Sequence, residues 1–223
     1  MGGFFGAVSS DDCVADLFFG TDYHSHLGTM RGGMAVLSGK GFQRAIHDIS
    51  NSQFRTKFEN DFRRFEGKCG IGVISDNEDQ PLIISSHLGL YAIVTVGVVT
   101  NLSALVEEMY ARRSVQFSEM SRGGINPTEL VATLINSQET LEAGVRYAQE
   151  KIEGSCSMLI LTSKGDLYAV RDRYGRTPVA VGQKEGAVAV AMESCSFPNL
   201  GYVSLRELGP GEMVRCACDW VET

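Results

Sequence analysis

Arg171-Asp172-Arg173-Tyr174-Gly175-Arg176-Thr177-Pro178 is the most informative block of the chain, because charged and turn-forming residues follow directly on two apolar segments. These segments, 157–162 and 167–171, are rich in aliphatic residues and are separated by Ser-Lys-Gly-Asp. Such a pattern is typical of an antiparallel hairpin. Gly175 and Pro178 favour a turn after the second strand. The block therefore predicts a strand pair that ends in a tightly turned loop.

Further strands and helices are expected on both sides of this block. Strand composition recurs at residues 3–8, 34–37, 70–75, 82–86, 91–99, 179–181, 187–192 and 213–216. Helices are expected at residues 13–19, with Asp12 as the cap, and at 103–112, 127–136 and 140–151. Residues 43–66 are polar, and Phe54, Phe58, Phe62 and Phe65 recur within them at helical spacing. Runs of strands with helices clustered between them predict layered α+β architecture with mainly antiparallel sheets.

Composition fits one globular domain over residues 1–223. The chain has 43% hydrophobic residues and a net charge of −7. This acidic balance argues against binding to nucleic acid, whose phosphates attract Lys and Arg. No apolar run approaches the ~20 residues of a membrane span, and no signal peptide is evident, so a cytoplasmic protein is expected.

Cysteine and histidine patterns predict neither disulfides nor a metal site. The six cysteines are irregularly spaced, which in a cytosolic chain is typical of free thiols. Cys216 and Cys218 would share one face of a strand, and His24 and His26 stand close together. Neither pair has companion ligands nearby, so we expect no metal and no cofactor in this domain.

Several segments in order resemble the class II glutamine amidotransferase domain of amidophosphoribosyltransferases. That family begins Cys-Gly-Ile-x-Gly-Ile, continues with His-Arg-Gly-Gln, and later carries Arg-Asp-x-Tyr-Gly-x-Arg-Pro, Ser-Glu-Ser-Cys and Pro-Gly-Glu. The matching segments here are 2–7, 26–29, 171–178, 193–195 and 210–212. Segments 69–72, 79–81, 97–102 and 128–130 match further family motifs. The resemblance covers nearly the whole chain and implies the four-layer αββα sandwich of N-terminal-nucleophile hydrolases.

The same resemblance implies that the glutaminase chemistry is lost. The family uses an N-terminal cysteine thiolate as nucleophile and the α-amine as base. An Asn amide and a Gly N–H hold the oxyanion, and Arg and Asp hold the substrate charges. Here the nucleophile position is Gly2 and the oxyanion pair is Val96 and Gly97. The family's Arg and Asp positions are occupied by Ser75 and Pro127.

Two further positions, Leu27 and Asp76, also depart from what binding of glutamine would need. His26 keeps the family histidine, but the arginine that follows it in the family is Leu27 here. Asp76 adds a negative charge where the substrate carboxylate would bind. We therefore interpret the chain as an amidotransferase domain that no longer hydrolyses glutamine, within a family of purine biosynthesis.

Two alternatives remain open. An unrecognised nucleophile could keep the domain active, although Cys69 lies inside the chain and Cys13 lies on an expected helix. Otherwise the domain is a non-enzymatic module that binds a metabolite or mediates assembly. Glutaminase activity and ligand screening would separate these alternatives.

The resemblance also implies partners and structural residues. In the family a phosphoribosyltransferase domain follows, so this chain is expected to be the N-terminal part of a longer protein that forms homo-oligomers. Arg171, Asp172, Tyr174 and Gly175 are expected to fasten a loop, with an interface to the following domain as the alternative.

Overall fold

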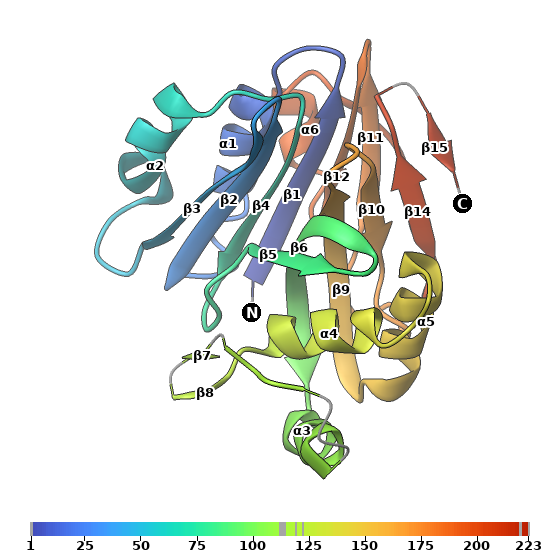
Figure 1. Cartoon of the computed structure of the whole chain (residues 1–223). Helices are drawn as coiled ribbons and strands as arrows, with labels where there is room; N and C mark the ends of the chain where they lie inside the picture. The colour runs from blue at the N-terminus through green and yellow to red at the C-terminus, as the bar shows by residue number, and fades with distance from the viewer. Residues whose placement is uncertain (1, 112–114, 119, 122, 219, 223) are drawn as a thin grey trace.

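The computed structural model describes residues 2–111, 115–118, 120–121, 123–218 and 220–222 (Figure 1). Its larger sheet has seven strands in the order β13-β11-β12-β1-β4-β2-β3, all paired antiparallel. These strands are β1 (Gly2–Ser9), β2 (Arg31–Ser38), β3 (Gly41–Asp48), β4 (Cys69–Ser75), β11 (Ala180–Lys184), β12 (Ala187–Ala191) and β13 (Val203–Glu207). The expected place of Gly2 at the start of a central strand is confirmed.

A second antiparallel sheet has the order β15-β14-β10-β9-β6-β5. Its strands are β5 (Leu82–Ser86), β6 (Gly89–Val99), β9 (Gly154–Thr162), β10 (Leu167–Val170), β14 (Met213–Cys216) and β15 (Val221–Glu222). The predicted hairpin around residues 163–166 is the β9–β10 pair. A short pair, β7 (Met120–Ser121) and β8 (Gly124–Ile125), stands apart from both sheets.

Helices cover the outer face of each sheet (Figure 1). Side chains of α1 (Val14–Asp22), α2 (Phe54–Arg64) and α6 (Ser196–Asn199) pack on the seven-stranded sheet. Those of α3 (Leu102–Ala111), α4 (Pro127–Asn136) and α5 (Leu141–Lys151) pack on the six-stranded sheet. A third apolar cluster fills the space between the sheets. The expected αββα layering is confirmed.

Strand alternation explains how β1 serves two cores at once. Phe4 and Val8 face the six-stranded sheet, whereas Phe5 and Ala7 face α1. All four side chains are buried to at least 95%, which is why the strand reads as a continuous apolar run.

Local sequence signals account for the helices. Phe54 and Phe58 form the buried side of α2, as their spacing predicts. At α4, Pro127 is the first helical residue and the Asn126 side chain accepts a hydrogen bond from Thr128 N–H at 2.9 Å. Arg112, the predicted end of the third helix, lies outside the described residues.

The strand β3 was not predicted within the polar segment 43–66. It forms a hairpin with β2 through a turn at Gly41, whose φ is +107°. Because β3 lies at the sheet edge and only Ala45 of it is buried, its residues lack the apolar contrast of a strand. The short elements α6, β7, β8, β13 and β15 were also missed.

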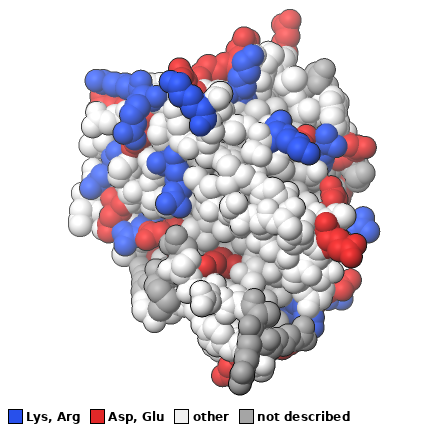
Figure 2. Space-filling model, viewed as in Figure 1, with Lys and Arg blue, Asp and Glu red and all other residues white. Residues whose placement is uncertain are grey.

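Charge is distributed without a single-sign field on the face in view. Figure 2 shows Lys and Arg side chains over the upper part of this face, interspersed with Asp and Glu. Among the described residues, no helix is both long and apolar enough to cross a bilayer.

Candidate functional site

Three neighbouring strands bring Gly2, Ser75 and Arg31 side by side. Gly2 of β1 pairs with Ser75 of β4, and Ser75 pairs on its other side with Arg31 of β2. Directly paired residues of an antiparallel sheet project to the same face. Two positions further along, Phe4 and Val73 lie in the core between the sheets. The row therefore faces the space between the sheets.

Gly2 leaves no room for a side chain. A Cβ atom built on Gly2 would lie 2.4 Å from the carbonyl oxygen of Ile74, a separation that real Cβ atoms essentially never show. The obstacle is backbone in the middle of the sheet, so it cannot rotate away as a flexible side chain could. A larger residue at position 2 requires the backbone of β1 or β4 to shift.

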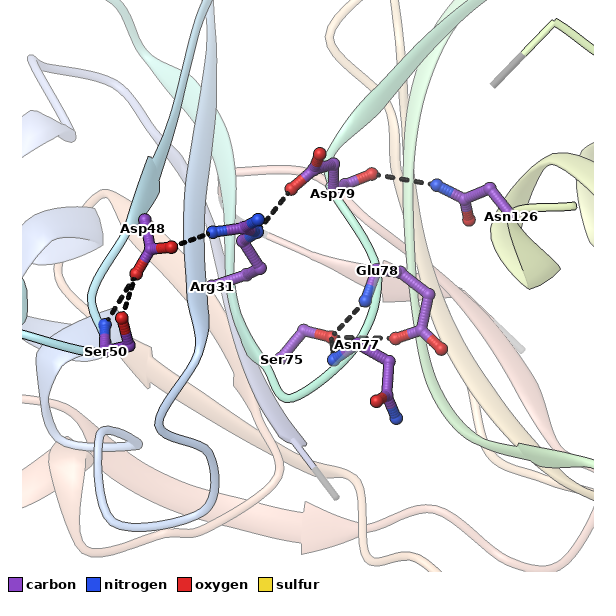
Figure 3. Close-up of polar contacts among 8 residues, drawn as sticks. All are labelled: Arg31, Asp48, Ser50, Ser75, Asn77, Glu78, Asp79 and Asn126. Atoms are coloured by element: carbon purple, nitrogen blue, oxygen red, sulfur yellow. Dashed lines mark hydrogen bonds and ion pairs between the residues drawn. The ribbon is translucent and has the colours of Figure 1, made fainter. Parts of the chain in front are cut away.

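Ser75 organises the loop that follows β4. Its hydroxyl donates to Glu78 Oε2 at 2.8 Å and accepts from the backbone N–H groups of Asn77 and Glu78, at 3.2 and 3.1 Å (Figure 3). Ser75 is 4% exposed. Ser75, which the resemblance predicts at the carboxylate-binding position, thus holds the loop that follows it.

Arg31 places a guanidinium in this row, but two carboxylates engage it. Its Nη1 lies 2.5 Å from Asp48 Oδ2 and its Nε lies 2.9 Å from Asp79 Oδ1 (Figure 3). Hydrogen bonds from Ser50, followed by the Arg31 guanidinium, lower the pKa of Asp48 to about 2, so this carboxylate stays ionised. The guanidinium is therefore already neutralised within the fold.

The carboxylate of Asp76 is used for the loop after α1. Its Oδ1 accepts a hydrogen bond from the Thr29 N–H at 2.8 Å. The residue therefore fastens the segment that follows His26 and Leu27.

A cavity of about 140 Å³ opens beside this row, where β6, β9 and the start of α4 meet. Its lining residues are Asn77, Glu78, Thr95, Gly97, Val98, Val99, Pro127, Ser155 and Cys156. Of the site positions named from the sequence, Gly97 and Pro127 line it. Ser75 reaches it through its hydrogen bond to Glu78.

Gly97 and Val96, the pair predicted at the oxyanion position, have different environments. Gly97 has φ of +151°, and a Cβ there would lie 2.0 Å from the Ser155 carbonyl oxygen. Only glycine fits this backbone. Val96 is 6% exposed and packs in the apolar cluster between the sheets. The residue that the resemblance predicts at the Asn position is therefore buried hydrocarbon.

Cys156 supplies a thiol to the cavity, which the sequence had not indicated. Burial, with Asp172 and Glu78 nearby, raises the pKa of Cys156 to about 12. The thiol is therefore protonated near neutral pH. Burial also raises the pKa of Cys69, to about 11, and that of Cys13. All six cysteines are free thiols, as expected.

His26 does not line the cavity. It is 57% exposed, and its Nε2 lies 2.8 Å from Glu193 Oε2. The neighbouring His24 is fully buried, donates from Nδ1 to the Gly20 carbonyl at 2.7 Å and accepts from Glu193 N–H at 3.2 Å. Burial lowers the pKa of His24, so the ring is neutral. No group of three metal-ligating side chains occurs among the described residues.

The loop at 171–178 is held by its own charged side chains. Arg171 donates to the carbonyl oxygens of Thr177 and Gly175, at 3.0 and 2.9 Å, and to that of Leu208. Asp172 is 1% exposed, and its carboxylate accepts from Tyr174 N–H and from Thr177 N–H and Oγ1. Gly175 has φ of +67°, whereas the Tyr174 ring is 54% exposed.

Sequence reasoning missed the two groups that set the charge of the site. Glu78 and Arg31 are not at family motif positions. The run Asp76-Asn77-Glu78-Asp79 after a buried strand was the only signal for Glu78. The role of Arg31 depends on the β2–β4 register, which the sequence does not reveal.

Comparisons with known proteins agree with this architecture. Residues 68–198 match the family model described as a glutamine amidotransferase domain. The chain is 26% identical to the amidophosphoribosyltransferase of Methanocaldococcus jannaschii, over 96% of this chain and 46% of that protein. It is 33% identical to the chloroplastic amidophosphoribosyltransferase 3 of Arabidopsis thaliana, over 60% of this chain and 25% of that protein.

The fold is also similar to that of solved structures. Glutamine phosphoribosylpyrophosphate amidotransferase from B. subtilis, complexed with ADP and GMP, superposes with a TM-score of 0.85 at 24% identity, over 99% of this chain and 48% of that one. This chain thus spans about half the length of its full-length matches. Because the family model matches more than half of the residues and the relatives and the fold agree with it, the chain belongs to the glutamine amidotransferase domain family, in the class II form that amidophosphoribosyltransferases carry.

Proposed function

We propose that this domain has lost glutaminase activity and serves an amidophosphoribosyltransferase-like protein in another capacity. The observation that carries the proposal is the Ile74 carbonyl oxygen, 2.4 Å from where a side chain at residue 2 would begin. A nucleophile presented from this strand position needs both a side chain and space in front of it. Residue 2 has neither.

The charges near the site also disfavour binding of glutamine. The α-carboxylate of glutamine needs a cation, and Arg31 is already paired with Asp48 and Asp79. Glu78 is instead among the residues that line the cavity, and its carboxylate would repel that end of glutamine.

Cys156 is the best candidate for a substitute nucleophile, and its environment argues against that role. Reactive cysteines have lowered pKa values beside cationic groups. The groups that influence Cys156 are carboxylates, and they raise its pKa. A thiol in such surroundings is a poor nucleophile near neutral pH.

The direct test is covalent trapping with 6-diazo-5-oxo-norleucine, a glutamine analogue that alkylates a catalytic thiol. We expect no adduct on the native chain by intact-mass analysis at concentrations that fully label an active class II amidotransferase. A stoichiometric adduct that maps to one cysteine and disappears when glutamine is added would overturn the proposal. The Cys156→Ser variant then shows whether that residue is responsible.

The relatives point to a longer protein, and the proposed loss of glutaminase activity would decide which nitrogen source that protein uses. We propose that a phosphoribosyltransferase domain is linked to this one and takes free ammonia, because nothing in this domain releases ammonia from glutamine. The supporting observation is that the chain spans about half of its full-length relatives. Formation of phosphoribosylamine from glutamine by the purified full-length protein, as fast as from ammonium, would contradict this.

A further inference from the structure

The cavity beside Gly97 is lined by ionisable charge of one sign only. Glu78 is the ionisable carboxylate in its lining, and no Lys, Arg or His is among the lining residues. Behind it, Asp172 acts on the same thiol, Cys156, as Glu78 does. The charged groups that line this space or act on its thiol are therefore carboxylates.

Glu78 lines the cavity and keeps hydrogen-bonding capacity. Its Oε2 accepts from the Ser75 hydroxyl, which fixes the direction of the side chain (Figure 3). Within the described part of the chain, Oε1 has no hydrogen-bond partner and no cation pairs with this carboxylate. A carboxylate has room for several donors on its two oxygens. Glu78 can thus still accept from a ligand.

The nearby positive groups are engaged elsewhere. Arg31 is held by its two aspartates, and the Arg176 Nη1 donates to the Gly154 carbonyl at 2.9 Å. The positive N-terminal end of α4 is served by the Asn126 cap and by the acidic Glu129 in its first turn. Arg176 keeps its charge in this contact, but neither it nor Arg31 is among the residues that line the cavity.

We propose that this cavity binds a small primary ammonium ion, such as a short alkylamine, and rejects amino acids. This inference rests on the proposed loss of glutaminase activity, since it assigns a new ligand class to the same site. An ammonium group has three N–H donors and one charge, which match the Glu78 carboxylate. Val98, Val99 and Pro127 line the remaining space with hydrocarbon for a short alkyl chain. An α-carboxylate on the ligand would meet negative charge without a cation.

The test uses three probes of similar size that differ in charge. Propylammonium, glycine and propionate each have only about four or five non-hydrogen atoms, which suits a cavity of about 140 Å³. Each is titrated into the ¹⁵N-labelled full chain at constant ionic strength in potassium chloride, near pH 7, where an alkylamine is protonated. Backbone amide shifts of Gly97 and Val98 report binding. We expect saturable shifts with propylammonium in the millimolar range, and no saturation with glycine or propionate.

Matched variants assign the effect to one carboxylate. Glu78→Gln keeps an acceptor for Ser75 and removes only the charge, so we expect the dissociation constant to rise at least tenfold. Glu185→Gln removes the same charge at an exposed turn between β11 and β12 and should leave binding unchanged. Val98→Phe adds bulk at a residue that is 60% exposed, so folding should be retained while the cavity is filled.

The outcomes separate this inference from the proposed function. It is overturned if propylammonium leaves Gly97 and Val98 unperturbed, if Glu78→Gln binds as well as the native chain, or if glycine binds as tightly. None of these results would restore a nucleophile. Conversely, an adduct with the diazo analogue would contradict the loss of glutaminase activity whether or not amines bind.

Discussion

Replacing Gly2 by cysteine should not create a glutaminase, for two separate reasons. The first is steric. The new Cβ would begin 2.4 Å from the Ile74 carbonyl oxygen, so the end of β1 must move away from β4. Forcing extra atoms into a packed site costs about 1–3 kcal/mol. The thiol would therefore be presented from a displaced strand end.

The second reason is chemical. Val96 supplies no oxyanion donor, and loss of one such donor lowers turnover by about 10²–10³. Ser75 and Pro127 supply no charged partner for glutamine, and each such hydrogen bond is worth about 1.5–3 kcal/mol, or roughly 10- to 150-fold. These losses affect one constellation and need not multiply. Together we expect turnover at least ~10³-fold below that of an active class II domain.

The assay is ammonia release from glutamine by the Gly2→Cys chain after Met1 removal has been confirmed by mass spectrometry. Gly2→Ala is the matched control, since it introduces the same Cβ without a thiol. Both variants should show the same loss of thermal stability and the same background ammonia. Robust turnover by Gly2→Cys alone would show that the pocket is intact and that the assignment of Ser75, Val96 and Pro127 is wrong.

Three further predictions concern stability and thiol reactivity. Gly97→Ala should lower the free energy of unfolding by ~4 kcal/mol, because its Cβ would meet backbone of β9. Gly89→Ala, with φ of +100° and open space around it, should cost only ~1–2 kcal/mol. Urea titration measures both. Burial lowers the pKa of His24, so the unfolded chain binds its proton first and stability should fall as pH drops below about 6.5 toward the lower folded pKa. His24 contributes up to ~1.4 kcal/mol per pH unit to the slope of the unfolding free energy against pH. His24→Gln should flatten this slope, and an unchanged slope would mean that another group causes it. Iodoacetamide should modify the exposed Cys195 before the buried Cys156, as read by peptide mass spectrometry, and the reverse order would contradict the burial argument.

Much of the fold could be predicted from the sequence because its strands and helices carry strong local signals. The β1 segment is apolar on both faces, and α4 begins with a capping Asn126 and Pro127. Strand β3 was missed because an edge strand with one buried residue has no distinctive pattern. Local periodicity cannot distinguish such a segment from a polar loop.

The site could be predicted only where family motifs fall. The positions of Gly2 and Gly97 follow from the resemblance, and their neighbours in space do not. Three contacts depend on strand register and loop geometry. Ile74 blocks residue 2, Arg31 stands beside Ser75, and Glu78 lines the same cavity as Cys156. Register is a tertiary property, set by which faces are buried together.

Release of ammonia from glutamine by the unmodified chain tests the central claim most directly. The chain would be incubated with glutamine labelled with ¹⁵N at the side-chain amide, and labelled ammonium would be followed over many hours. We predict a rate equal to that of buffer, for the native chain and for Cys156→Ser alike. Labelled ammonium above background in the native chain, abolished by substitution of a single residue, would contradict the account.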